Sequence, residues 1–107
     1  MNRKELLDGA KALVYGDRNA QHGDPRPSLE GIAALWSVYK GVPFEAYDVA
    51  AMMILLKISR LRFSPDLIDG WMDIAGYAAC GAEVLPQVLP KALDYRVYAM
   101  EMHEDDD

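Results

Sequence analysis

Four charged residues in an otherwise apolar stretch are the first candidates for chemistry. Lys57 and Arg60 are three residues apart, and Asp69 and Asp73 are four apart. On a helix, each spacing places its two side chains on one face. Two such carboxylates can share a hard cation such as Mg²⁺, and the two basic side chains can hold phosphate oxygens. The same four residues can instead pair with one another, because buried charges need partners.

Two helices joined by a short turn are expected to carry these charges. We predict one helix over residues 44–62 and the next over residues 65–85, with Ser64 as N-cap and Pro65 and Asp66 in the first turn. The first of these helices is apolar on nearly every side, which predicts a place in the centre of a bundle or against a second copy. The second is rich in small residues in its C-terminal half, which permits the close approach of another helix.

Such a hairpin predicts which charges meet. Both helices rise about 1.5 Å per residue, so residues equally distant from the turn lie at the same height. Lys57 is then level with Asp73, and Arg60 is level with Asp69. Tyr77 lies one turn further along the acidic side and can join the network through its hydroxyl group. If the charges serve stability alone, they form a ladder that fixes the register of the two helices.

The segment from Tyr15 to Ser28 is the second candidate for ligand binding. Its glycines and prolines are turn residues that interrupt a helix. Arg18 and Arg26 are suited to phosphate, and Tyr15 is suited to stacking on a base. The alternative is a simple connector in which Asp24-Pro25 begins the next helix.

The remaining pattern predicts an all-α fold. The chain has 107 residues, of which 51% are apolar and 26% are charged, as in one folded domain. A first helix is predicted over residues 2–14, and a second starts after Pro27 or Ser28 and is capped by Gly41. We therefore expect a single four-helix bundle-like domain over residues 1–90, completed by homo-oligomerisation. Residues 91–107 are expected to form a C-terminal arm and a disordered acidic tail.

Charge and hydropathy argue against several classes of function. The net charge is −6, and removing the four carboxylates of residues 104–107 leaves −2. No basic face is visible, which argues against binding to duplex nucleic acid. No apolar run reaches the roughly 18–20 residues of a membrane span. With one cysteine, Cys80, read as a buried thiol, and no signal-peptide pattern, the protein is expected in the cytoplasm of a bacterial host.

Three blocks of the sequence carry a resemblance. YGDRN, DVAAMMILLKISRL and DGWMDIAGYAACGAE resemble a family of small phage- and prophage-encoded proteins of unknown function. More distantly, Lys57-x-x-Arg60-Leu61 and the series Asp69, Asp73, Tyr77 are similar to the nucleotide modification associated domains of phages. The helical architecture and late acidic pair also resemble the MazG-like all-α NTP pyrophosphohydrolases, which use Mg²⁺ and oligomerise. Lys57 and Arg60 stand where those enzymes carry an E-x-x-E box.

The resemblance implies a phage-type nucleotide-handling protein with a MazG-like fold, which binds or also hydrolyses a (d)NTP. In an enzyme of that kind, Asp69 and Asp73 would hold Mg²⁺ while Lys57 and Arg60 stabilise phosphate charge. The missing E-x-x-E box favours binding, so no catalytic residue is assigned. The alternative is a non-catalytic oligomeric accessory protein with a purely structural ladder. The predicted ligand-binding residues are Tyr15, Arg18, Arg26, Lys57, Arg60 and Tyr77.

Overall fold

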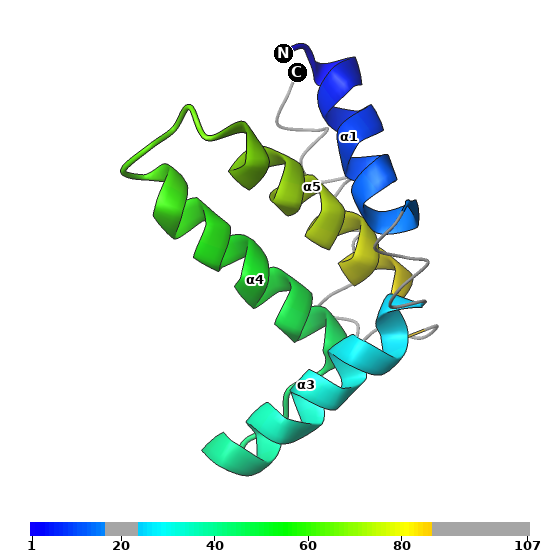
Figure 1. Ribbon diagram of the computed structural model, residues 1–107. Coiled ribbons are helices and arrows are strands. Elements are labelled where there is room, and N and C mark those ends of the chain that lie inside the picture. The colour runs from blue at the N-terminus through cyan, green and yellow to red at the C-terminus, as the bar shows by residue number, and fades with distance from the viewer. Residues whose placement is uncertain (17–23, 87–107) are drawn as a thin grey trace, which may run out of the picture.

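The computed structural model describes residues 1–16 and 24–86 (Figure 1). These residues form four helices and no strand, which confirms the all-α prediction: α1 (Arg3–Tyr15), α3 (Pro25–Lys40), α4 (Ala46–Leu61) and α5 (Ile68–Glu83). None of the described helices has the length and hydrophobicity needed to cross a membrane. Arg18 and the predicted arm and acidic tail lie outside the described residues.

The helices do not pack in the order in which they follow one another along the chain. α5 lies between α1 and α4, and α3 packs on α4 at a wide angle (Figure 1). The first turn of α3 also reaches the end of α5, where Arg26 Nη2 donates a hydrogen bond to the Glu83 carbonyl oxygen at 2.7 Å. The end of α1 and the beginning of α3 therefore both lie against the C-terminal half of α5, which is far from them in the sequence.

The predicted antiparallel hairpin of α4 and α5 is confirmed. Near the turn, Leu61 lies against Gly70, and further along, Ala50 lies against Gly81. A Cβ atom on Gly81 would be only 3.0 Å from the Ala50 Cβ atom, so the close approach of the two helices depends on this glycine. The small residues in the C-terminal half of α5 were predicted to permit the close approach of another helix, and Gly81 does so for α4.

The turn of this hairpin differs from the prediction. Ser64 does not cap α5, because Leu67 N donates to the Ser64 carbonyl oxygen at 3.2 Å and closes a β-turn, and α5 begins only at Ile68. Pro65 fits the second position of a turn as well as the first position of a helix, so its presence could not distinguish the two. Trp71 Nε1 donates to the Pro65 carbonyl oxygen at 2.9 Å and fastens the turn to α5.

Helix α3 begins earlier than its apolar spacing predicted. Asp24 is the N-cap, and its carboxylate accepts a hydrogen bond from Arg26 N at 2.8 Å, so the start predicted after residue 27 or 28 is wrong. The alternative start at Asp24-Pro25 is the observed one, since proline fits the first helical position. At the other end, Gly41 has the left-handed φ of 71° and ends the helix as predicted.

The hydrophobic core lies where α3, α4 and α5 meet. Its buried side chains are small or medium-sized: Leu29, Ala33, Ala46, Val49, Ala50 and Val84. Trp36 packs against this core and contacts Phe44 edge to face, with ring centroids 5.9 Å apart. Trp36 therefore has a packing role.

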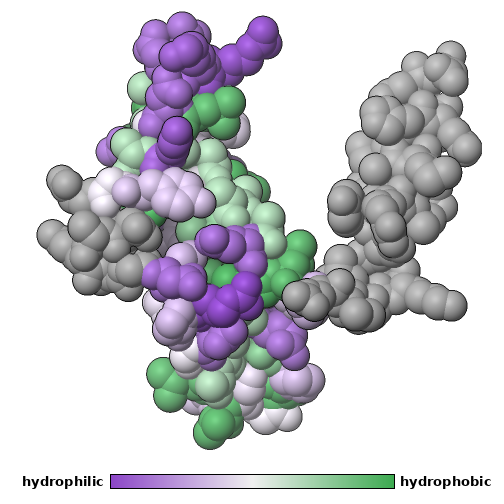
Figure 2. All heavy atoms as spheres, turned by 90° about the vertical axis from the view of Figure 1, so that its right-hand side faces the viewer, coloured by the Kyte–Doolittle hydropathy of each residue, from purple (hydrophilic) through white to green (hydrophobic). Residues whose placement is uncertain are grey.

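Large apolar side chains remain on the surface. Hydrophilic side chains crowd the end where α1 begins, whereas hydrophobic side chains reach the surface at the end of α3 (Figure 2). The outer side of α4 is also apolar, with Leu55 63% exposed and Ile58 49% exposed. Helix α4 is thus not enclosed by the described helices, so the first of the two predicted alternatives, a position in the centre of the bundle, does not hold for them. Burial by a second copy stays a prediction.

Candidate functional site

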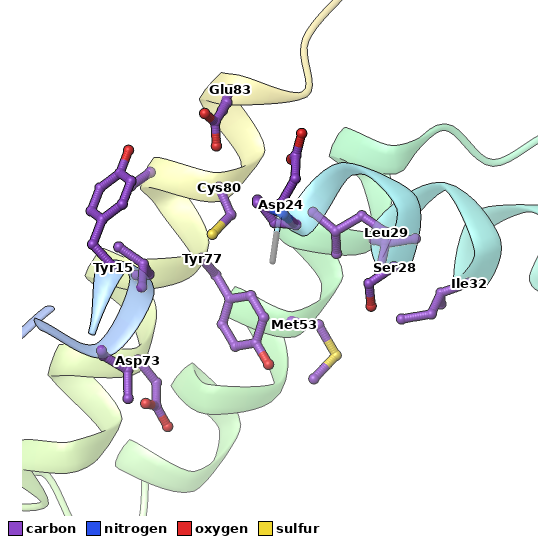
Figure 3. Close-up of a pocket in the computed structure, with 16 residues that line it drawn as sticks. Tyr15, Asp24, Ser28, Leu29, Ile32, Met53, Asp73, Tyr77, Cys80 and Glu83 are labelled. Carbon is purple, nitrogen blue, oxygen red and sulfur yellow. The ribbon is translucent and has the colours of Figure 1, made fainter. Parts of the chain in front are cut away.

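A cavity of about 690 Å³ lies where the four described helices approach one another (Figure 3). Its walls are largely apolar and include Leu13, Val14, Leu29, Ile32, Val49 and Met53. Polar groups come from different helices: Tyr15, Asp24, Ser28, Asp73, Tyr77 and Glu83. An apolar interior with a few polar groups, at a volume of roughly 300–1,000 Å³, is typical of small-molecule sites.

One face of α5 supplies half of these polar groups. Asp73, Tyr77, Cys80 and Glu83 follow one another at three- or four-residue intervals and all line the cavity. The Tyr77 ring reaches from α5 toward Met53 of α4 (Figure 3). Cys80, predicted to be buried, is half-buried and packs against the core.

The end of α1 closes another side of the cavity. A Cβ atom on Gly76 would lie 3.3 Å from Val14 Cγ1, so the absence of a side chain there lets α1 pack directly on α5. Tyr15, the next residue, is the last of α1 and is 65% exposed at the rim. An exposed aromatic ring beside a cavity is free to contact a ligand.

The ion pair predicted between Lys57 and Asp73 is present. Lys57 Nζ is 3.0 Å from Asp73 Oδ2, and the two side chains are only 17% and 27% exposed. The pair joins α4 to α5, and the Asp73 carboxylate also belongs to the cavity wall. Lys57 does not itself line the cavity, but the ion pair holds it next to Asp73, which does. Loss of either charge would leave the other without its partner.

The second predicted pair does not form. Arg60 and Asp69 are both exposed, and no ion pair joins them in the described residues. Leu61 occupies the position that faces α5 here, and Arg60 is turned about 100° from it around the helix. The two charges instead lie in the last turn of α4 and the first turn of α5, where each complements its helix dipole. Neither residue lines the cavity.

Arg26 does not line the cavity, although Asp24 and Pro25 before it do, and it connects two helices. Besides its hydrogen bond to the Glu83 carbonyl oxygen, its Nη1 atom is 3.7 Å from Glu30 Oε1. The guanidinium group has five N–H donors, so these contacts leave donors for a phosphate. Its predicted role in ligand binding stays a prediction.

The two aspartates predicted to hold Mg²⁺ have different surroundings. Asp69 is exposed in the first turn of α5, and Asp73 is bonded to Lys57. Within residues 1–16 and 24–86, no group of three acidic, histidine or cysteine side chains is arranged as a metal site. Mg²⁺ is often held by one or two carboxylates together with phosphate oxygens. The described residues thus form no complete donor set, and a shared Mg²⁺ ion stays a prediction.

Several cavity residues were not singled out from the sequence. The apolar lining and the carboxylate of Glu83 were missed, and Asp24 was noted as a polar residue of the Tyr15–Ser28 segment without a binding role of its own. Glu83 had a detectable signal, because it continues the helical spacing of Asp73 and Tyr77 along α5. The apolar lining had none, since residues from four helices meet only in the folded chain.

The chain belongs to a family described as a domain of unknown function (DUF6378), which matches residues 5–85. This finding agrees with the resemblance to phage proteins of unknown function, since similar proteins come from mycobacteriophages. The Gene 55 protein of Mycobacterium phage D29 is 39% identical over 77 residues, which cover 72% of this chain and 51% of that protein. The Gene 55 protein of Mycobacterium phage L5 is 46% identical over 74 residues, covering 68% and 47%.

The chain thus spans about half the length of these two relatives. No solved structure matches it.

Proposed function

We propose that this member of the DUF6378 family binds a nucleoside or nucleotide in the cavity between its described helices. The observation that carries the proposal is the convergence of Tyr15, Asp73 and Tyr77 on one cavity, with Lys57 fixed to Asp73 at its edge. Aromatic rings can stack on a base, and apolar walls favour its burial.

The polar groups suggest how such a ligand is oriented. The carboxylates of Asp24, Asp73 and Glu83 line the cavity and can accept hydrogen bonds from sugar hydroxyl groups or from an exocyclic amino group. The same carboxylates repel a bare phosphate. Phosphates would therefore lie toward Arg26 and Lys57, or enter with Mg²⁺ as a counterion, which makes the Mg²⁺ dependence of binding informative.

Binding without hydrolysis is the activity that we propose. In the resembling enzymes the helix before the acidic pair carries an E-x-x-E box, whereas here Lys57 occupies that helix and bonds to Asp73. A basic side chain at this place neutralises a carboxylate that hydrolysis would need for Mg²⁺. Release of pyrophosphate or phosphate from a (d)NTP would overturn this part of the proposal while leaving the cavity as the site.

Thermal-shift measurements with nucleosides, monophosphates and triphosphates, each with and without Mg²⁺, test the proposal. A ligand that binds only the folded state at a hundred times its Kd stabilises that state by about 2.7 kcal/mol. The Tyr77→Leu variant should lose the shift. Tyr39→Leu is the matched control, because Tyr39 is 85% exposed on α3 and absent from the cavity lining, and it should keep the shift. The absence of a shift with all these ligands would contradict the proposal.

A second candidate function is that of a non-catalytic accessory protein, in which the Lys57–Asp73 pair is purely structural. The observation in its favour is that this pair joins α4 to α5 with both side chains largely buried. The double change Lys57→Met with Asp73→Leu distinguishes the two functions. If the variant folds and keeps the full ligand shift, the pair has no part in binding; loss of the shift in a folded variant supports its place in the site.

A further inference from the structure

We propose that a second copy of this chain docks antiparallel on the outer face of α4, with Leu55 at the two-fold axis. The outer face is defined here by Asp48, Ala51, Met52, Leu55, Ile58, Ser59 and Arg62. It lies away from the cavity, so the inference is independent of ligand binding.

The outer face has the spacing of a coiled-coil seam. Asp48, Met52, Leu55, Ser59 and Arg62 alternate in steps of four and three residues, which keeps them on one side of a helix. The opposite side of α4 carries the residues buried against the neighbouring helices, Ala46, Val49, Ala50 and Leu61. No described helix covers the outer face, which lies along one edge of the molecule (Figure 1).

The centre of the outer face is apolar and exposed. Met52 is 40%, Leu55 is 63% and Ile58 is 49% exposed. Burying an apolar side chain of this kind from water contributes about 1.5–3 kcal/mol when burial is complete. A two-fold arrangement buries each of these three side chains once in each copy, so six apolar side chains contribute to the contact.

The charges at the two ends decide the direction of pairing. In an antiparallel pair centred on Leu55, residues equally distant from it lie at the same height, so Asp48 faces Arg62 of the second copy at both ends. A parallel pair would place Asp48 opposite Asp48 and Arg62 opposite Arg62, and both contacts would be repulsive. One oxygen of Asp48 accepts a hydrogen bond from Glu45 N at 2.8 Å, which holds its carboxylate in place for a partner.

The same register makes the surfaces complementary in shape. Met52 lies level with Ile58 of the second copy, and beside Ile58 there is a groove of about 490 Å³ that is also lined by Leu55, Pro65 and Trp71. Trp71 is 47% exposed there. Each copy therefore offers a flexible Met52 side chain and a groove to receive one. Such a self-complementary patch is what a two-fold contact requires.

The small residues complete this pattern. Ala51 lies level with Ser59 of the second copy, and both side chains are exposed. Small residues at opposed positions allow the two backbones to come close, so that the apolar centre can interdigitate. No partner of different sequence is needed to explain the charge, shape and size pattern, and for that reason we choose a second copy as the occupant.

The first experiment is light scattering at micromolar concentration. The unchanged chain should have twice the mass of one copy, and Leu55→Asp should convert it to a monomer because two carboxylates would meet at the axis. Circular dichroism should show an unchanged helix content, since Leu55 is mainly exposed. Leu35→Asp is the matched control: Leu35 is 72% exposed on α3, and this variant should remain a dimer. A monomeric unchanged chain, or a dimeric Leu55→Asp variant, would overturn the proposal.

Disulfide cross-linking tests the register in a Cys80→Ala background. The Leu55→Cys variant should cross-link to a second copy under mild oxidation, whereas Leu35→Cys should not. The Ala51→Cys and Ser59→Cys variants should cross-link only when they are mixed, because each position faces the other. Cross-linking of Ala51→Cys with itself as efficiently as in the mixture would indicate a parallel pair and refute the antiparallel arrangement.

Discussion

Two pairs of opposite charges lie at successive heights, or levels, along the α4–α5 hairpin: Lys57 with Asp73, and Arg60 with Asp69. The two pairs behave differently, although the same spacing rule predicted a contact in each. Lys57 and Asp73 form a largely buried ion pair at 3.0 Å. Arg60 and Asp69, one turn nearer the connecting turn, are exposed and make no ion pair with each other. Equal height is therefore only one condition for a contact between helices. The side chains must also point across the interface, and near the turn Leu61 against Gly70 holds that place.

The two levels also differ in their relation to the candidate site. The Lys57–Asp73 level borders the cavity, so a change there affects both helix packing and the site. The Arg60–Asp69 level borders only solvent. Mutations at the two levels therefore show how the same types of charge contribute beside the cavity and at the solvent-exposed surface.

The largest effect is expected from Asp73→Asn. This change leaves the Lys57 ammonium group largely buried without its counter-charge. Loss of one partner from a fully buried pair costs about 3–5 kcal/mol, and residual solvent access to this pair should reduce the cost to about 2 kcal/mol. Urea denaturation gives the free energy of unfolding. A loss below about 0.5 kcal/mol, the usual size of an ordinary surface change, would show that the pair does not stabilise the hairpin.

An intermediate effect is expected from the double change Lys57→Met with Asp73→Leu. Apolar residues of similar volume can replace a buried ion pair with little loss of stability, so the free energy of unfolding should return to within about 1 kcal/mol of the unchanged protein. The same denaturation experiment measures it. A double variant as unstable as Asp73→Asn would indicate that contacts specific to the Lys57 and Asp73 side chains, and not the stranded charge, determine stability.

The sequence predicted the helices and their hairpin because local signals determine them. Apolar stretches together with helix-start and helix-stop residues located all four described helices, and Gly41 marked the end of α3. The start of α5 was predicted wrongly, because Ser64-Pro65 has the chemistry of both a helix start and a β-turn. The choice between them depends on contacts made only after folding, such as the hydrogen bond from Trp71 to the Pro65 carbonyl oxygen.

The candidate site was predictable only in part, for a similar reason. Asp73 and Tyr77 were found because they lie on one helix at a regular spacing. Met53, which lines the same cavity, looked like an ordinary core residue of an apolar helix. Its role follows from the wide angle between α3 and α4, and no spacing within one helix encodes that angle (Figure 1).

The smallest effects on stability are expected at Asp69 and Arg60, the solvent-exposed pair. Asp69→Asn removes a favourable charge from the first turn of α5, and Arg60→Gln removes one from the last turn of α4; each should cost about 0.3–1 kcal/mol and less at high salt. Because the two side chains do not bond to each other, their effects should add. A double-mutant cycle measured by urea denaturation should thus give a coupling energy within about 0.5 kcal/mol of zero. The corresponding cycle for Lys57 and Asp73 should give clear coupling, since each single change strands the other charge. Strong coupling between Arg60 and Asp69 would mean that these residues meet in solution, and that the second predicted pair forms after all.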